Sequence, residues 1–265
     1  MRVEPAAIER AAALIRVARL GRVPLDVLPA DCRPSDEDEA YRVQEALNRQ
    51  LTAAGEGPLA GHKIGCTTPV MQAFLNIPNP CAGEVFGRTV SLGHGTFRTA
   101  DFLHVGVECE IAVQLAADLD GRGGQGQGRL EDAVGAVMAS IEIVDDRYRD
   151  YPTLGTPTLI ADDFFNAGCV LGEPVRDWRR LDLAAIAGRM LINGEEVGVG
   201  HGADILGHPF EALAWLAGSL SDRGRTLRAG EFVSLGSVVA TKWVAPGDDV
   251  RIELDGLGEA RATFV

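Results

Sequence analysis

The first 55 residues carry apolar side chains at helical spacing. Over residues 5–20 they recur every three or four positions, at Ile8, Ala11, Ala12, Ile15 and Ala18. Further on, Ser35 with Asp38 has the form of a helix start, and the apolar positions that follow are Tyr41, Val43, Leu47 and Leu51. The pattern predicts two helices in an N-terminal helical segment over residues 1–55.

From Gly61 onward the period changes to that of β-strands. Short β-rich runs such as GHKIGCT, VECEIAV, SIEIVDD and RMLINGEEVG are separated by glycine, proline and asparagine. Asn193-Gly194 predicts a tight hairpin, and helices are expected here only over residues 130–138 and 209–220. We therefore predict an α+β fold in a single domain over 1–265, with flanking helices and a β-rich, roll-like or barrel-like core over 56–265.

Composition limits the classes of partner. The chain has 265 residues, of which 38 are acidic and 25 basic, so its formal net charge is −13. Nucleic acids and anionic membranes attract clustered cations, and no basic cluster or long apolar span is present in the sequence, so neither partner is expected. The five cysteines are scattered without a CxxC pair, which favours free thiols and a cytoplasmic location.

One glycine-rich stretch imitates a dinucleotide-binding motif. Residues 121–129 read GRGGQGQGR, which contains GxGxxG after a predicted strand and has Asp145 about twenty residues further on. Asp118 and Asp120 would place two anions where a pyrophosphate has to approach, which disfavours this reading. A glycine hairpin tip is the preferred interpretation, and an NAD-binding protein is the weaker alternative.

Three glutamates stand in apolar strands. Period-two alternation in VGVECEIAV puts Glu108 and Glu110 on one face, about 6–7 Å apart. The pair alone would suit a solvated strand face or a bridging divalent cation. Glu142 lies between Ile141 and Ile143 and is expected to point away from the core. Three oxygen donors of this kind suit Mg²⁺ or Mn²⁺ better than zinc or iron.

The motifs together resemble a known family. GHKIGCT, VECEIA, ASIEIVDDR and GLGEARATF are similar to motifs of the fumarylacetoacetate hydrolase superfamily, in its 2-keto-4-pentenoate hydratase and 4-oxalocrotonate decarboxylase branch. The resemblance runs over nearly the whole chain. It implies a β-rich catalytic core in which Glu108, Glu110 and Glu142 hold Mg²⁺ or Mn²⁺, with Lys63 in the active site.

Lys63 is a candidate catalytic residue on independent grounds. A lysine in an apolar strand is costly to bury unless an anion meets it, and that anion could be a protein carboxylate or a 2-oxo acid substrate. Further catalytic candidates are Asp162 and Asp163, one of which is expected to manage water. The candidate substrate-binding residues are Gly236, Ser237 and Phe165.

Two segments depart from the pattern of the branch. Cys81 stands where relatives usually carry an acid, in a PDxG-like motif. Residues 162–166 read DDFFN where relatives read DNASS-like. The two phenylalanines predict a more apolar pocket.

The resemblance implies a metal-dependent lyase acting on a small 2-oxo acid. The expected reaction adds water to a 2-hydroxy-2,4-dienoate or 2-oxo-enoate and gives a 4-hydroxy-2-oxo acid in the degradation of aromatic compounds. The alternatives are a decarboxylase of the 4-oxalocrotonate type and a C–C bond hydrolase of an acylpyruvate-like substrate. A homodimer or higher homo-oligomer is expected.

Overall fold

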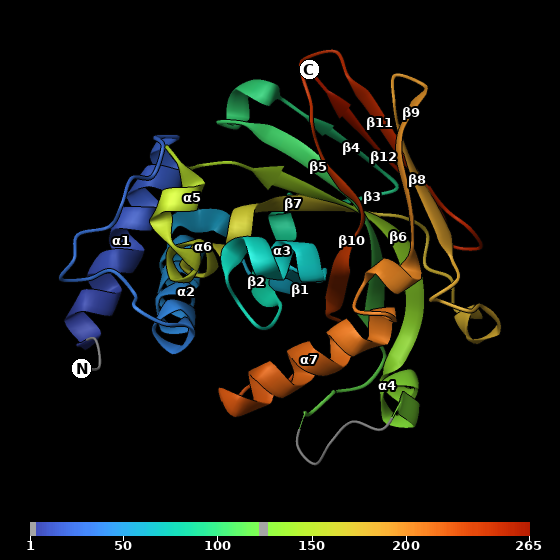
Figure 1. The fold of residues 1–265 in the computed structure, drawn as a ribbon, viewed down its shortest axis with the longest axis horizontal. Helices are drawn as coiled ribbons and strands as arrows, with labels where there is room; N and C mark the ends of the chain where they lie inside the picture. The colour runs from blue at the N-terminus through green and yellow to red at the C-terminus, as the bar shows by residue number, and fades with distance from the viewer. Residues whose placement is uncertain (1–3, 122–126) are drawn as a thin grey trace.

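Two β-sheets with flanking helices make up the computed structural model, which describes residues 4–121 and 127–265 (Figure 1). The larger sheet has the strand order β2-β1-β10-β5-β6-β7-β3. Its strands are β1 (Leu59–Gly65), β2 (Cys81–Phe86), β3 (Val90–Leu92), β5 (Val105–Leu115), β6 (Val134–Asp145), β7 (Asn166–Leu171) and β10 (Phe232–Trp243).

The smaller sheet has the order β4-β12-β11-β8-β9. Its strands are β4 (His94–Phe97), β8 (Ala187–Ile192), β9 (Glu195–His201), β11 (Asp249–Leu254) and β12 (Gly258–Phe264). Apolar side chains such as Met190, Ile252 and Phe264 are fully buried in the main core. Within the described residues neither sheet closes on itself, so the α+β prediction is confirmed as a roll of two open sheets.

The helices lie around the larger sheet. They are α1 (Pro5–Gly21), α2 (Glu37–Leu51), α3 (Pro69–Leu75), α4 (Gln127–Ala133), α5 (Tyr151–Leu154), α6 (Thr156–Ala161) and α7 (Pro209–Asp222). In Figure 1, α1 and α2 stand side by side at one end of the molecule, and α7 crosses below the sheets. Within the described ranges we find no helix long and apolar enough to cross a membrane.

Two local predictions need correction. Asp36, and not Ser35, caps α2 by accepting a hydrogen bond from the Glu39 backbone N–H, while Ser35 donates to the Glu39 carboxylate. The expected helix over 130–138 ends at Ala133, and the remaining residues begin β6. The apolar run there pairs with β5, and this cross-strand pairing outweighs helical periodicity.

Other local predictions are confirmed. The hairpin at Asn193-Gly194 has positive φ at both residues, 53° and 82°, as a type I′ turn requires. The helix expected over 209–220 is α7. The proposed glycine hairpin tip and the GxGxxG alternative depend on residues 122–126, which lie outside the described residues.

The central strands set up the functional site. β5 pairs antiparallel with both β10 and β6, and β1 runs parallel to β10 on the other side. Cys109 of β5 faces β8 of the smaller sheet, where its sulfur lies 4.0 Å from the Arg189 carbonyl oxygen. Because side chains alternate along a strand, Glu108 and Glu110 point to the opposite face of the larger sheet.

Candidate metal centre and active site

Glu108, Glu110 and Glu142 come together on the central strands. Glu108 of β5 stands directly opposite Glu142 of β6, and Glu110 lies two residues further along β5. One carboxylate oxygen from each lies within 4.8 Å of those of the other two. Glu142 is fully buried, Glu110 is 1% exposed and Glu108 is half-buried, so a solvated strand face is the wrong interpretation.

Each glutamate is held through one of its two oxygens. Thr241 donates a hydrogen bond to Glu108 Oε1, Ser234 to Glu110 Oε2 and Asn166 to Glu142 Oε1, the last over 2.9 Å. Among the described residues, Glu110 Oε1 and Glu142 Oε2 are buried without a hydrogen-bond partner. Two carboxylate oxygens are therefore oriented and left available.

Sequence reasoning missed Ser234 and Thr241, which hold two of these carboxylates. Both lie on β10, the strand that pairs with the glutamate-bearing β5. Hydroxyl residues in a β-rich run are common, so only the pairing of β10 with β5 distinguishes them. Had that pairing been foreseen, Ser234, close to the predicted Gly236 and Ser237, would have been a reasonable candidate.

Lys63 of β1 lies beside the triad. Its side chain is 3% exposed, and its Nζ is 3.2 Å from Glu142 Oε1. Burial lowers the pKa of the ammonium, but the negative charges of Glu142, Glu108 and Glu110 outweigh this effect and raise the pKa. Lys63 is therefore a fixed positive charge at neutral pH, paired with one glutamate of an acid-rich cluster.

The carboxylates repel each other in a dry environment. Burial raises the pKa of Glu110 well above its ordinary value, and the charges of Glu142 and Glu108 raise it further. Burial likewise raises the pKa of Glu142, although Lys63 opposes this. Three acids against one lysine leave the cluster short of positive charge. Oxygen-only donors with two unpartnered oxygens fit a hard divalent cation such as Mg²⁺ or Mn²⁺.

The segment 162–166 borders this cluster. Phe164 is buried, with its ring centroid 5.5 Å from Lys63 Nζ, and Asn166 carries the amide that bonds Glu142. Phe165 packs edge-on against Phe164, Tyr148 and Tyr151, at centroid distances of 5.6, 4.9 and 5.5 Å. An apolar, aromatic wall therefore stands next to the lysine.

Asp162 and Asp163 are buried but face arginines. Asp162 Oδ2 accepts hydrogen bonds from Arg147 Nε and the Tyr148 hydroxyl, both at 3.0 Å. Asp163 Oδ2 lies 3.2 Å from Arg19 Nη1. Both carboxylates are thus engaged in ion pairs outside the glutamate triad. Their catalytic role stays a prediction, and these contacts favour a positioning role.

Gly236 and Ser237 lie next to the triad on β10. The Gly236 N–H is 3.4 Å from Glu110 Oε2, and its φ of 126° favours glycine. A Cβ at Gly236 would lie 2.4 Å from Thr67 Oγ1, so no side chain fits there. The Ser237 hydroxyl lies 2.5 Å from the Val239 carbonyl oxygen and 3.2 Å from the Cys109 carbonyl oxygen. Contact of either residue with substrate stays a prediction.

Cys81, the first of the two departures from the expected motifs, is fully buried on β2. A hydrogen bond with Cys66, together with burial, raises the pKa of the Cys81 thiol. The thiol therefore stays protonated and packs as a small apolar group. All five cysteines are free, as the sequence predicts, and all five are buried.

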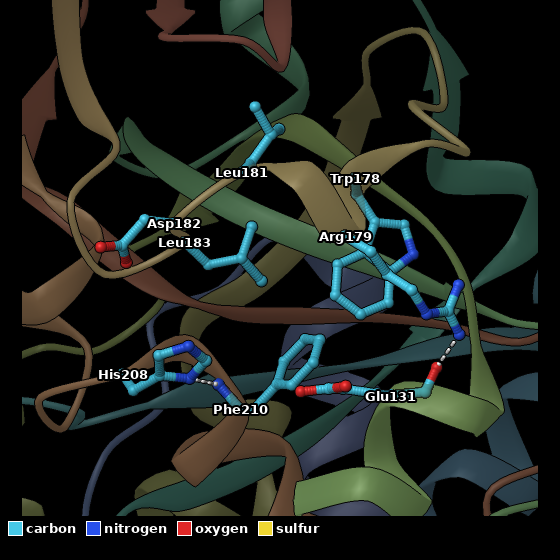
Figure 2. A pocket seen from close by; sticks show the side chains of 8 residues that line it. All are labelled: Glu131, Trp178, Arg179, Leu181, Asp182, Leu183, His208 and Phe210. Atoms are coloured by element: carbon cyan, nitrogen blue, oxygen red, sulfur yellow. Dashed lines mark hydrogen bonds between the residues drawn. The ribbon is translucent and has the colours of Figure 1, made fainter.

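A separate hollow of about 230 Å³ is shown in Figure 2. It lies between α4, the turn at Trp178 and the start of α7, away from the triad. Arg179 stacks on Trp178 at 4.8 Å and donates a hydrogen bond to the Glu131 carbonyl oxygen. His208 caps α7 by accepting from the Phe210 N–H. His201 precedes the short helix Gly202–Asp204, and its backbone N–H donates to Asp204 Oδ2 over 2.7 Å. The glutamate cluster therefore remains the candidate active site.

The fold and the site define a member of a known enzyme family. The model of the fumarylacetoacetate (FAA) hydrolase C-terminal domain matches residues 76–265. The chain therefore belongs to the fumarylacetoacetate hydrolase family, as its motifs indicate. All three glutamates lie within the matched residues, whereas Lys63 and the helices α1 and α2 precede them.

Two curated relatives cover most of the chain. A 2-keto-4-pentenoate hydratase from Paraburkholderia phymatum is 34% identical over 260 residues, which is 97% of each protein. A 4-oxalocrotonate decarboxylase from Pseudomonas putida is 31% identical over 227 residues, covering 86% of this chain and 85% of the relative. The chain is thus similar to both branches of activity.

Solved structures agree with this assignment. The 4-oxalocrotonate decarboxylase from Pseudomonas putida G7, complexed with magnesium and adipate, matches with a TM-score of 0.93. It is 28% identical, and the match covers 100% of this chain and 99% of that one. A fumarylpyruvate hydrolase from Pseudomonas aeruginosa, in complex with Mn²⁺ and pyruvate, has a TM-score of 0.63 at 15% identity and covers 78% and 89% of the two chains. This second match supports the fold alone.

Proposed function

We propose that the protein is a metal-dependent hydratase of the 2-keto-4-pentenoate type. It would add water to a 2-hydroxy-2,4-dienoate, or to the 2-oxo-enoate formed from it, and release a 4-hydroxy-2-oxo acid. The observation that carries the proposal is the buried triad of Glu108, Glu110 and Glu142 with Lys63 beside it. The hydratase relative that is 34% identical over 97% of the chain supports this choice of reaction.

We propose Mg²⁺ or Mn²⁺ as the cofactor. Glu108, Glu110 and Glu142 would hold the cation, two of them through oxygens that have no hydrogen-bond partner among the described residues. Bound there, a divalent cation supplies Lewis-acid stabilisation for negative charge that develops on the C2 oxygen of the substrate. The relative in complex with magnesium supports this class of metal.

Lys63 is the proposed catalytic cation. Its ammonium stays charged, because the neighbouring carboxylates raise its pKa despite burial. It can therefore bind the C1 carboxylate of a 2-oxo acid or hold a proton for transfer to the enol carbon. The ring of Phe164, 5.5 Å from Nζ, limits the approach of water from that side.

The remaining predicted residues would shape the pocket. Gly236 places its backbone N–H beside Glu110, Ser237 follows it, and Phe165 extends the aromatic wall. We propose that these three contact the substrate. Asp162 and Asp163 would act by holding the segment 162–166 in place, because their carboxylates are bound to Arg147 and Arg19.

Product analysis tests the proposal. The enzyme with Mn²⁺ is given 2-hydroxypenta-2,4-dienoate, and we expect loss of dienol absorbance with one equivalent of 4-hydroxy-2-oxopentanoate detected by NMR. Glu110→Gln should abolish this turnover. Glu253→Gln changes a glutamate of the smaller sheet that pairs with Arg189, and it should leave the rate unchanged. Recovery of unhydrated 2-oxo acid alone would contradict the proposal.

A decarboxylase is the second candidate. The TM-score of 0.93 to the 4-oxalocrotonate decarboxylase favours it. The same enzyme preparation is given 4-oxalocrotonate, and release of CO₂ without hydration of the monocarboxylate would select this alternative. An acylpyruvate in a third arm would reveal C–C bond hydrolysis by its two fragments.

We further propose a homo-oligomer in the cytoplasm. The five buried free thiols suit a reducing compartment. On α1, Leu14, Val17 and Leu20 form an apolar stripe whose members are 38%, 62% and 45% exposed, and such a stripe is typical of an interface. Sedimentation of the wild type and of Val17→Glu would test it, since the variant should shift toward monomer.

A further inference from the structure

Three consecutive residues beside the active site have left-handed backbone. The φ angles of Asp163, Phe164 and Phe165 are 54°, 49° and 69°. Residues other than glycine rarely adopt the left-handed region of φ and ψ, and three in a row persist there only where surrounding contacts hold them. Contacts from the surrounding structure must therefore hold residues 163–165 in this conformation.

Polar contacts from the N-terminal helices and from Arg147 hold it. Arg147 donates to the carbonyl oxygens of Asp162, Phe165 and Asn166, over 2.9, 3.2 and 2.8 Å. Arg19 of α1 places Nη1 3.2 Å from Asp163 Oδ2, and its Nη2 donates to the Asn166 carbonyl oxygen over 3.3 Å. Asn48 of α2 donates to Asp163 Oδ1 over 3.1 Å, and so does the Glu84 backbone N–H over 3.0 Å. The Arg19 side chain is only 15% exposed, so these contacts lie away from bulk water.

The segment places two side chains, those of Phe164 and Asn166, next to the glutamate triad and Lys63. Phe164 lies over Lys63, and the Asn166 side chain donates to Glu142 Oε1 over 2.9 Å. Arg19 holds both ends, since one of its nitrogens meets the carboxylate of Asp163 and the other meets the backbone of Asn166. This fork requires a planar guanidinium, which can bind two acceptors at once.

We infer that Arg19 is a positioning residue of the active site. From the first helix, it holds residues 163–165 in their left-handed backbone and binds the Asn166 carbonyl, so that Asn166 orients the Glu142 carboxylate and Phe164 packs against Lys63. The inference rests on the proposed function for its catalytic consequence, while its consequence for metal binding does not. Groups that orient a metal ligand typically change affinity or activity by about 10–100-fold when they are removed.

A purely structural role is the competing explanation. In that case Arg19 only neutralises the buried Asp163, and Arg19→Met weakens the site only by unfolding part of the protein. The double variant Arg19→Met/Asp163→Asn separates the two. It removes both charges and retains an acceptor for the Glu84 N–H, while the fork is lost.

Mn²⁺ titration by electron paramagnetic resonance is the principal measurement, made on protein shown to be folded by circular dichroism. We expect the double variant to melt close to wild type and to bind Mn²⁺ about tenfold more weakly. With saturating Mn²⁺, its kcat should fall by a similar factor with little change in KM. Arg22→Met is the matched control, because Arg22 follows the same helix and pairs with the exposed Asp101.

Wild-type Mn²⁺ affinity in the folded double variant would overturn the inference. Equal weakening by Arg22→Met would overturn it as well, because the Arg22 side chain bonds the Ala100 carbonyl and the Asp101 carboxylate. If the wild-type enzyme binds Mn²⁺ but hydrates no dienoate, the proposed function fails while the Mn²⁺ comparison still decides the role of Arg19.

Discussion

Two clusters of buried acids lie side by side in this protein, and they differ in charge balance. Glu108, Glu110 and Glu142 share one cation, Lys63, whereas Asp162 and Asp163 face the guanidinium groups of Arg147 and Arg19. Within the described chain, Glu110 Oε1 and Glu142 Oε2 are buried without a hydrogen-bond partner; Asp162 Oδ1 also has none, but Arg19 Nη1 lies 3.5 Å from it. The aspartates hold a backbone segment through ion pairs.

The glutamate cluster has the properties of a metal-ligand site, whereas the two aspartates have those of structural ion pairs. Sequence alone marks all five acids as candidate site residues, because each is an acid in an apolar or motif-like context. Their counter-charges distinguish them, since an acid cluster that the protein itself leaves under-neutralised is suited to receive a cation. The following predictions test that distinction.

Metal removal should have the largest effect. Exhaustive chelation should lower turnover by more than about a thousandfold, because the negative charge that develops on the substrate oxygen loses its stabilising cation. Mn²⁺ should restore activity and raise the melting temperature, since it binds only the folded state. Steady-state kinetics and thermal melts with and without EDTA give the measurement, and full activity in the chelated enzyme would rule out the metal centre.

Arg147→Met should instead act on stability. Its removal leaves the buried Asp162 with only Arg19, whose Nη1 lies 3.5 Å from Oδ1, and breaking a buried pair in this way costs about 3–5 kcal/mol. Arg149→Met is the control, because the pair of Arg149 with Asp26 is exposed and is worth at most about 1 kcal/mol. Urea unfolding measures both. Equal effects of the two variants on the free energy of unfolding would show that the pair of Asp162 and Arg147 has no special role in stabilising the fold.

Lys63→Met should lower kcat/KM by about a hundredfold at saturating Mn²⁺, because the substrate loses a positioned charge. Lys242, the other lysine of the chain, lies further along β10, and Lys242→Met should keep its rate. Initial rates with a 2-oxo acid substrate provide the test. If the Lys63→Met enzyme has a normal kcat/KM, the role of Lys63 is only to neutralise Glu142.

Glu110→Gln should have the smallest effect, on the stability of the metal-free protein. Burial raises the pKa of Glu110 in the folded state above its unfolded value of 4.5, so the folded state binds more protons between these two values. The contribution of Glu110 to the free energy of unfolding of the wild type therefore falls as the pH rises from the unfolded to the folded pKa of this group. At pH 8 in EDTA the variant should be more stable by roughly 0.5–2 kcal/mol.

The pH dependence provides the check on this last effect. The advantage of Glu110→Gln should shrink as the pH falls, because wild-type Glu110 then takes up its proton. Urea unfolding of both proteins at several pH values measures the difference. Asp162→Asn should behave in the opposite way and destabilise the fold, because Arg147 is then left without its carboxylate. A constant gap across the pH series would show that Glu110 is not the titrating group.

Sequence reasoning could find the triad because strand geometry is local. Alternation alone puts Glu108 and Glu110 on one face, and Glu142 stands out between two isoleucines. The same reasoning could not find Arg19 or Asn48. Helical spacing assigns them to their helices, whereas their contact with Asp163 depends on how α1 and α2 pack, more than a hundred residues away in the chain.

The errors have the same origin. Residues 134–138 satisfy a helical pattern, yet they form the start of β6 because β5 is available as a partner. The sequence indicated Asp162 and Asp163 as possible catalysts because a motif gives residue types but not the residues that contact them in the folded protein. In both cases a long-range contact decided between two locally acceptable interpretations.

The parallel pairing of β1 with β10 affects how the protein is made. Lys63 stands opposite Ser234, a residue near the carboxyl end, and Ser234 in turn bonds Glu110 on the next strand. During synthesis β1 and β5 therefore emerge long before the strand that separates them. Until then each exposes an unpaired edge, which favours aggregation and engages chaperones. A nascent chain can assemble the cluster of Glu108, Glu110 and Glu142 with its β10 partners only after β10 has left the ribosome.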